Sequence, residues 1–157
     1  VNGTAAGAGF SLALAGDYVI AADQAKFVSA YTAAGLTPDG SSTYYLAKHV
    51  GLLRAKELMF TNRVLSADEA CAWGIVNRVV AGEQLMDEAR KMAASFAAGP
   101  TRAYGELKEL LLTAYAESFE TQLDKETRAI AGMQKTHDGP HGIESFLNKR
   151  KPDFKGR

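Results

Sequence analysis

The spacing of apolar residues changes near residue 84, and this change most restricts the folds open to the chain. Before it, apolar residues come in short runs separated by glycines and turn residues, as at 18–20 and 26–29. Such runs predict short buried strands. After it, apolar residues recur at helical spacing over three stretches, 84–98, 101–117 and 118–133. We therefore expect an α/β protein, with a mixed core over residues 1–83 and a helical region over 84–157.

Local start and stop signals place the shorter helices. Ser66, followed by Asp68 and Glu69, is a typical helix start, and Gly74 is a typical stop. The same reasoning predicts helices in the first part from about 9 to 16, at 43–50, at 52–60 and at 67–73. Gly139 and Pro140 predict a loop over 137–142, before a last helix at 143–149.

Charge and cysteine content exclude several classes of function. Eighteen basic and eighteen acidic residues balance, which argues against a general nucleic-acid-binding protein. Cys71 is the only cysteine, so the chain forms no internal disulfide and no multi-cysteine metal site. The longest apolar stretch, 5–20, is too short and too rich in small residues for a membrane span. We expect a cytoplasmic protein without a metal site. The chain begins at Val1, inside a glycine-rich motif, so we also expect that an N-terminal part precedes it.

The segment Gly7-Ala8-Gly9 is expected to open a helix. Glycines allow a ligand to approach the backbone closely, and free N–H groups at a helix start attract negative charge. The segment suits a thioester oxyanion or a phosphate, but tight packing of the helix on a strand explains it equally well. A dinucleotide-binding motif fits less well, because no strand is expected before the glycines and the G-x-G-x-x-G spacing is absent.

Asp39 lies in the sequence Pro38-Asp39-Gly40. Taken alone, these residues favour an ordinary turn. The functional alternative is a carboxylate held on a rigid loop beside a pocket, where it acts as a base or a nucleophile.

The remaining reactive side chains have mostly structural explanations. Gly139 and Pro140 should break a helix between His137 and His141, so the two rings are not expected to share a face. Cys71 and Trp73 are expected to pack in the core.

The basic tail, 149–157, is most simply a solvated terminus. The last helix also carries a second option, because Phe146 and Lys149 on one face could bind an anionic, aromatic ligand such as an adenine nucleotide.

Several short motifs, in this order, resemble the crotonase (enoyl-CoA hydratase/isomerase) superfamily. The resemblance extends over the whole chain, and the ordered succession is more specific than any single motif. The motifs are V-N-G-T-A-A-G-A-G at 1–9, L-A-L-A-G-D at 12–17, A-K-F at 25–27, G-L-T-P-D at 35–39, G-L-L-R-A at 51–55, A-C-A-W-G-I-V at 70–76 and F-L-N-K-R-K-P-D-F-K-G at 146–156.

The resemblance implies a spiral core of ββα units, of which this chain holds the C-terminal part, and a helical region that builds homotrimers or dimers of trimers. It implies an acyl-CoA thioester substrate, no cofactor beyond the coenzyme A of that substrate, and neither nucleic acid nor membrane as a partner. Two backbone N–H groups hold the thioester carbonyl in the family. The second corresponds to Ala8, flanked by Gly7 and Gly9, and the first would lie before Val1. Phe146 and Lys149 correspond to positions that contact the CoA nucleotide.

Departures from the family pattern favour one reaction. Hydratases of the family use two glutamates, whose positions correspond to Ser11 and Tyr31 here. Asp39 corresponds to the single acid of relatives that isomerise enoyl-CoA or ring-opened phenylacetyl-CoA epoxides, and to the nucleophile of 4-chlorobenzoyl-CoA dehalogenases. Those dehalogenases carry Trp at the position of Tyr31 and Asn at that of Pro38. The resemblance therefore implies an isomerase with Asp39 as acid and base and Tyr31 in the substrate site. A hydratase, a dehalogenase and an inactive acyl-CoA-binding module remain alternatives.

Overall fold

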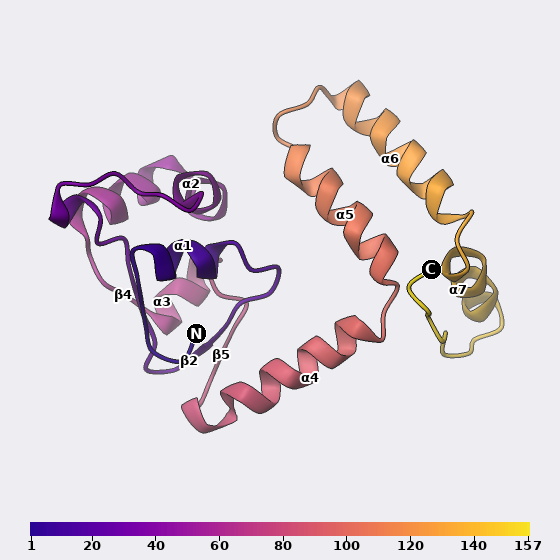
Figure 1. Cartoon of the computed structure of the whole chain (residues 1–157), viewed down its shortest axis with the longest axis horizontal. Helices are drawn as coiled ribbons and strands as arrows, with labels where there is room; N and C mark the ends of the chain where they lie inside the picture. The colour runs from indigo at the N-terminus through magenta and orange to yellow at the C-terminus, as the bar shows by residue number, and fades with distance from the viewer. The chain divides into compact units, whose positions relative to one another are not determined.

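The computed structural model describes residues 1–157 and contains two compact units, Val1–Ala89 and Arg90–Arg157 (Figure 1). The boundary between the units falls inside the helix α4, Leu85–Ala97, a few residues after the predicted change at residue 84. No helix in the chain is both long and apolar enough to cross a lipid bilayer.

Five very short strands make two small sheets in the first unit. In one sheet, β3 (Lys26–Val28) is central, parallel to β1 (Thr4–Ala6) and antiparallel to β4 (Leu65–Ser66). In the other, β2 (Ile20–Ala22) runs parallel to β5 (Arg78–Val80). The predicted strand at 26–29 is confirmed. The strand predicted at 18–20 begins only at its last residue, Ile20.

The helices of the first unit follow the predicted start and stop signals closely. They are α1 (Ala8–Leu14), η1 (Thr32–Ala34), α2 (Ser42–Thr61), α3 (Ala67–Ala72) and η2 (Gly82–Gln84). Ser66 caps α3, because its side chain accepts a hydrogen bond from the Glu69 amide at 3.2 Å. Gly51 has non-helical dihedral angles (φ 78°, ψ 162°), so α2 consists of two helical segments that meet where a stop was predicted.

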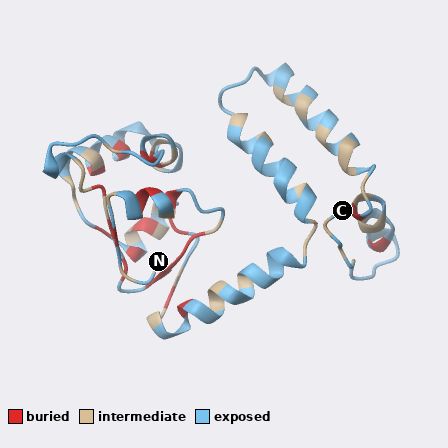
Figure 2. Ribbon diagram, viewed as in Figure 1, coloured by how far each residue is buried: buried red, intermediate tan, exposed pale blue.

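The core of the first unit forms between these helices and the two sheets. Its largest buried side chains include Phe10, Leu14, Phe27, Leu46, Leu58 and Leu65 (Figure 2, red). The rings of Phe10 and Phe27 lie 5.5 Å apart, which joins α1 to the central strand β3. Cys71 and Trp73 pack against this core, as predicted.

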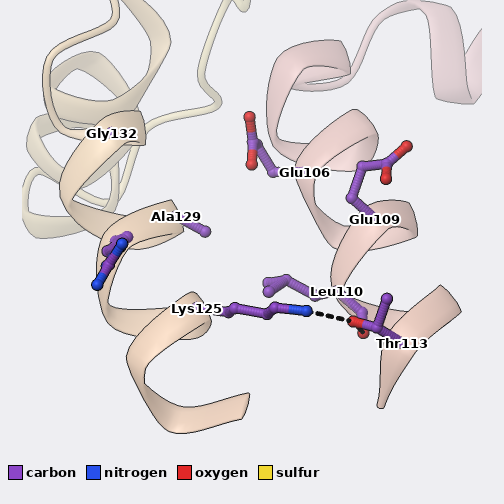
Figure 3. Close-up of a pocket in the computed structure, with 8 residues that line it drawn as sticks. Glu106, Glu109, Leu110, Thr113, Lys125, Ala129 and Gly132 are labelled. Carbon is purple, nitrogen blue, oxygen red and sulfur yellow. Dashed lines mark hydrogen bonds between the residues drawn. The ribbon is translucent and has the colours of Figure 1, made fainter. Parts of the chain in front are cut away.

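The second unit contains helices and no strands, and its helices after the end of α4 are α5 (Thr101–Thr113), α6 (Phe119–Met133) and α7 (Asp138–Leu147). Helices α5 and α6 run side by side in opposite directions (Figure 1). A groove of about 390 Å³ between them has acidic side chains on α5 and basic side chains on α6. Figure 3 shows Glu106 and Glu109 on α5, and Lys125 of α6 reaching Thr113 at 3.4 Å.

The loop predicted at 137–142 was wrong, because α7 already begins at Asp138. Proline lacks an amide hydrogen, but Pro140 lies in the first turn, where amides have no helical partner. The helix therefore continues through Gly139 and Pro140. As a result, the rings of His137 and His141 stack with centroids 5.6 Å apart, contrary to the expectation that they would not share a face.

The charged side chains of the C-terminal segment are exposed, as expected of a solvated terminus, but its backbone is held in place. It folds back on the start of α7, where the buried Asp138 carboxylate accepts hydrogen bonds from the amides of Lys155 (2.8 Å) and Gly156 (2.7 Å). Burial alone would raise the pKa of Asp138, but these bonds and one with His137 Nδ1 outweigh it and hold the pKa below its ordinary value. The Asp153 amide also donates to His141 Nε2 at 3.0 Å.

Candidate functional site

The start of α1 presents backbone amides without helical partners. Gly7 has a φ of 52°, in the left-handed region that favours glycine, and its own amide donates to the Val28 carbonyl at 3.1 Å. The first bond of the helix runs from Ser11 N to Gly7 O at 3.0 Å. The amides of Ala8 and Gly9 therefore precede the helical ladder, and both residues are exposed.

A strand, β1, does come directly before these glycines, so the expectation that none would was wrong. The spacing of the glycines still departs from the dinucleotide-binding pattern.

Asp39 is fixed through its backbone carbonyl, while its side chain lies at the surface. Three donors approach that carbonyl oxygen: Ser11 Oγ at 2.9 Å, Ser42 Oγ at 3.0 Å and the Ser42 amide at 3.2 Å. Ser11 and Ser42 are both buried. Because three groups from two helices hold one carbonyl, the loop before α2 has little freedom to move.

Gly40 allows this loop to pack on α1. Its φ is 60°, and a Cβ atom at this position would lie 2.9 Å from Ser11 Cβ. A non-glycine side chain would therefore be unfavourable both in its backbone conformation and in its contact with Ser11. The requirement for glycine follows from the close approach of the Asp39 loop to α1.

Tyr31 joins α1 to the Asp39 side chain. Its hydroxyl donates to Asp39 Oδ1 at 2.5 Å and lies 3.2 Å from Ser11 Oγ. The edge of its ring faces Gly7 and would stand 3.8 Å from a Cβ atom there. Ser11, Tyr31 and Asp39, 28 residues apart at their extremes, thus form one hydrogen-bonded group beside the first amides of α1.

The backbone on both sides of this group is strained. Ala30, directly before Tyr31, and Ser41, two residues after Asp39, both have a φ of 63° although neither is glycine. Each such residue costs about 1–2 kcal/mol. Strain of this kind persists only where surrounding contacts impose it, and it is common near functional groups.

Phe146 and Lys149 lie in the second unit, and the expectation that one helix carries both was wrong. Helix α7 ends at Leu147, and Lys149 follows its C-cap with a φ of 52°. The amides of Lys149 and Arg150 donate to the carbonyls of Phe146 and Ser145, both at 3.0 Å. This pair of bonds is a Schellman motif, which ends the helix at Leu147, with Asn148 as its C-cap. Phe146 is 81% exposed.

The structure holds no group of three or more His, Cys, Asp or Glu side chains that could bind a metal ion. Asp39 makes no ion pair within the chain, and its bonded neighbours are hydroxyl groups and an amide.

Sequence reasoning did not identify Ser42 as a second anchor of the Asp39 carbonyl. The signal for it was the serine two residues after the Pro38-Asp39-Gly40 turn, since serine hydroxyls commonly bond backbone groups at helix starts.

Comparison with known proteins gives a consistent result over the whole chain. A family model described as enoyl-CoA hydratase/isomerase matches residues 1–157. The chain is 42% identical over 159 residues to 1,2-epoxyphenylacetyl-CoA isomerase of Escherichia coli K12, and covers 60% of that protein. It is 36% identical over 165 residues to carnitinyl-CoA dehydratase of Salmonella agona, and covers 62% of it.

A crystal structure of an enoyl-CoA hydratase from Polaromonas sp. JS666 superimposes with a TM-score of 0.92 at 37% identity. The match covers 98% of this chain and 60% of that one. The chain thus spans about 60% of the length of the relatives it matches. The names of these relatives include an isomerase, a dehydratase and a hydratase.

Proposed function

The chain belongs to the enoyl-CoA hydratase/isomerase family, and from this premise we propose that the full-length protein is an enoyl-CoA isomerase with Asp39 as its acid and base. The observation that carries the proposal is the group formed by Ser11, Tyr31 and Asp39. Asp39 is the only carboxylate in this group, and the other two members are hydroxyl groups. The 42% identity to a protein named as an isomerase also supports it.

The reaction requires a stabilised enolate and one base. The thioester carbonyl would accept a hydrogen bond from the Ala8 amide, with Gly7 and Gly9 allowing close approach, and a second from a group outside these 157 residues. Such a donor is typically worth about 3–4 kcal/mol in the transition state. Asp39 would remove a proton from one carbon of the acyl chain and return it two carbons away. The double bond shifts, no atom is gained or lost, and no water takes part.

Hydration would need carboxylates to activate water and to deliver its proton. The two positions that carry them in hydratases hold Ser11 and Tyr31, and a hydroxyl group is too weak a base at neutral pH for this work. Dehalogenation would need Asp39 as a nucleophile toward an aromatic ring. These two reactions, and an acyl-CoA-binding protein without activity, are the alternatives.

The products separate the candidates directly. Full-length protein would be incubated with a panel of enoyl-CoA and phenylacetyl-derived CoA thioesters, and the products read by mass spectrometry and chromatography. We expect a product of unchanged mass with a shifted double bond. Rapid formation of 3-hydroxyacyl-CoA or release of halide would contradict the proposal, and so would a lack of any turnover across the panel.

We also propose that Phe146 and Lys149 contact the CoA nucleotide, with the exposed ring against adenine and the ammonium on a phosphate. Lys149→Ala is expected to raise the KM for acyl-CoA about three-fold, most clearly at low salt, with little change in kcat. Stability should hold, because alanine and lysine are equally disfavoured at this left-handed position. The KM would be compared for CoA and dephospho-CoA thioesters, with the exposed Lys151→Ala as control. An unchanged KM would leave Lys149 without a role in nucleotide binding.

We propose a homotrimer, or a dimer of trimers, as the working assembly. None of the apolar side chains of the second unit is fully buried, and α5 and α6 contain no buried residue. Large exposed apolar residues there include Leu111, Tyr115, Phe119, Ile130 and Leu147. Apolar faces of this extent normally pack against another surface. Light scattering of the full-length protein at micromolar concentration should give a multiple of three subunits, and a uniform monomer would contradict the proposal.

A further inference from the structure

We infer that Tyr31 is a positioning residue that holds the Asp39 carboxylate by Oδ1 and so assigns Oδ2 as the atom that takes the substrate proton. The inference rests on the proposed function of Asp39 as a base. The expectation was that Tyr31 simply lines the substrate site; the inference gives it a specific task instead.

In the hydrogen bond between Tyr31 and Asp39, the tyrosine is the donor. An ionised carboxylate only accepts hydrogen bonds, so the Tyr31 hydroxyl must donate its single hydrogen to Asp39 Oδ1. Ser11 Oγ is 3.2 Å from the same hydroxyl and can donate to its lone pairs, or to the Asp39 carbonyl oxygen at 2.9 Å. The chain offers Asp39 Oδ2 no partner, whereas Oδ1 is occupied.

The hydrogen bond from Tyr31 to Asp39 Oδ1 can form in both protonation states of Asp39. When Oδ2 takes a proton, Oδ1 becomes the carbonyl oxygen of a carboxylic acid and still accepts from Tyr31. The bond therefore holds the carboxyl group in one orientation while the proton waits to be returned. Because the Asp39 side chain is exposed, without this bond it could rotate toward water.

Three features give Tyr31 the rigidity that such a task needs. Its ring is half-buried and lies against Gly7. Its hydroxyl contacts a buried serine of α1. The residue before it, Ala30, is held in the left-handed region, which directs the chain as it enters Tyr31. A side chain fixed at both ring and hydroxyl can orient a partner with little loss of its own freedom.

Tyr31→Phe removes the hydroxyl and leaves the ring. We expect kcat for isomerisation to fall about 10- to 100-fold, with the KM within about two-fold of the parent. A second readout is deuterium uptake in D₂O. An untethered Asp39 can exchange its proton with solvent before returning it, so the variant should incorporate more deuterium per molecule of product. A purely structural change would not lower kcat selectively at constant KM. It would also leave the amount of deuterium per molecule of product unchanged.

The matched control is Tyr45→Phe, which removes the hydroxyl of another half-buried tyrosine of the same unit; Tyr45 lies on α2 and packs against the hydrophobic core. It should match the parent in both readouts, and thermal unfolding should verify that both variants are folded. If Tyr31→Phe equals the parent in kcat and in deuterium per product, the inference is wrong even though Asp39→Asn is inactive. If Asp39→Asn itself isomerises normally, the proposed function has failed first.

Discussion

The Asp39→Asn variant of the full-length protein is expected to lose isomerase turnover by roughly 10²- to 10⁴-fold. The change removes the only carboxylate of the site but is nearly isosteric. The backbone carbonyl of residue 39 can keep the three hydrogen bonds from Ser11 and Ser42. The oxygen of the new side-chain amide can still accept from Tyr31. Acyl-CoA binding should therefore remain close to that of the parent, and the loss should appear in kcat.

The measurement combines turnover with a direct binding titration. Asp23→Asn is a suitable control, because Asp23 is an exposed carboxylate of the same unit whose side chain accepts from the neighbouring Gln24 amide. Turnover of Asp39→Asn within a factor of a few of the parent would show that another group acts as the base. Weak acyl-CoA binding together with slow turnover would indicate that the Asp39 loop has lost its structure, which thermal unfolding would reveal.

The Asp138→Asn variant is expected to release the C-terminal segment from α7. The carboxylate, 5% exposed, accepts two amides and a histidine nitrogen. An amide side chain has one acceptor oxygen, and its NH₂ group would face a second donor. We expect trypsin to cut after Lys155 on the order of ten-fold faster in the variant, because the amides on both sides of that bond lose their partner.

The effect has a definite pH dependence. The pKa of Asp138 in the folded protein is lower than its ordinary value of 3.8, so its ionised form stabilises the fold. This contribution is fully present above pH 3.8 and is lost as the pH falls through the lower value of the folded protein. The free energies of unfolding of parent and variant should therefore differ at neutral pH and become equal in strong acid. Asp124→Asn, at an exposed carboxylate paired with Arg128 on α6, should leave cleavage after Lys155 nearly unchanged. Equal cleavage of Asp138→Asn and parent at pH 7 would contradict this account.

Local signals in the sequence were sufficient for most helix boundaries. Ser66 and Ser118 both cap helices through their own side chains, at places where the residues alone predicted a start. Such caps involve only residues three positions apart, so they can be read without the fold. The break at Gly51 is local in the same sense. Strand ends were less predictable, because β2 is defined by pairing with Arg78–Val80, far along the chain.

The candidate site could be predicted only in part. The residues of Pro38-Asp39-Gly40 alone favour a turn, and Asp39 was identified by its place in a family pattern. The contact of Tyr31 with Asp39 depends on the strained backbone at Ala30 and on the packing of Gly40 against α1, and no sequence period encodes either. The hydrogen bonds that hold the C-terminal segment to Asp138 were not predicted for the same reason, since the partners of Asp138 lie 17 and 18 residues away.

The packing of Gly40 on Ser11 also limits the routes by which this sequence can evolve. If position 11 corresponds to a glutamate of the hydratases, as the resemblance implies, that glutamate meets an obstacle here, because Ser11 Oγ contacts the Asp39 carbonyl at 2.9 Å. A longer side chain would need the space that the Asp39 loop occupies. A lineage that keeps this loop is therefore confined to small residues at position 11. A glutamate at position 11 would therefore require the Asp39 loop to be remodelled before, or together with, its arrival.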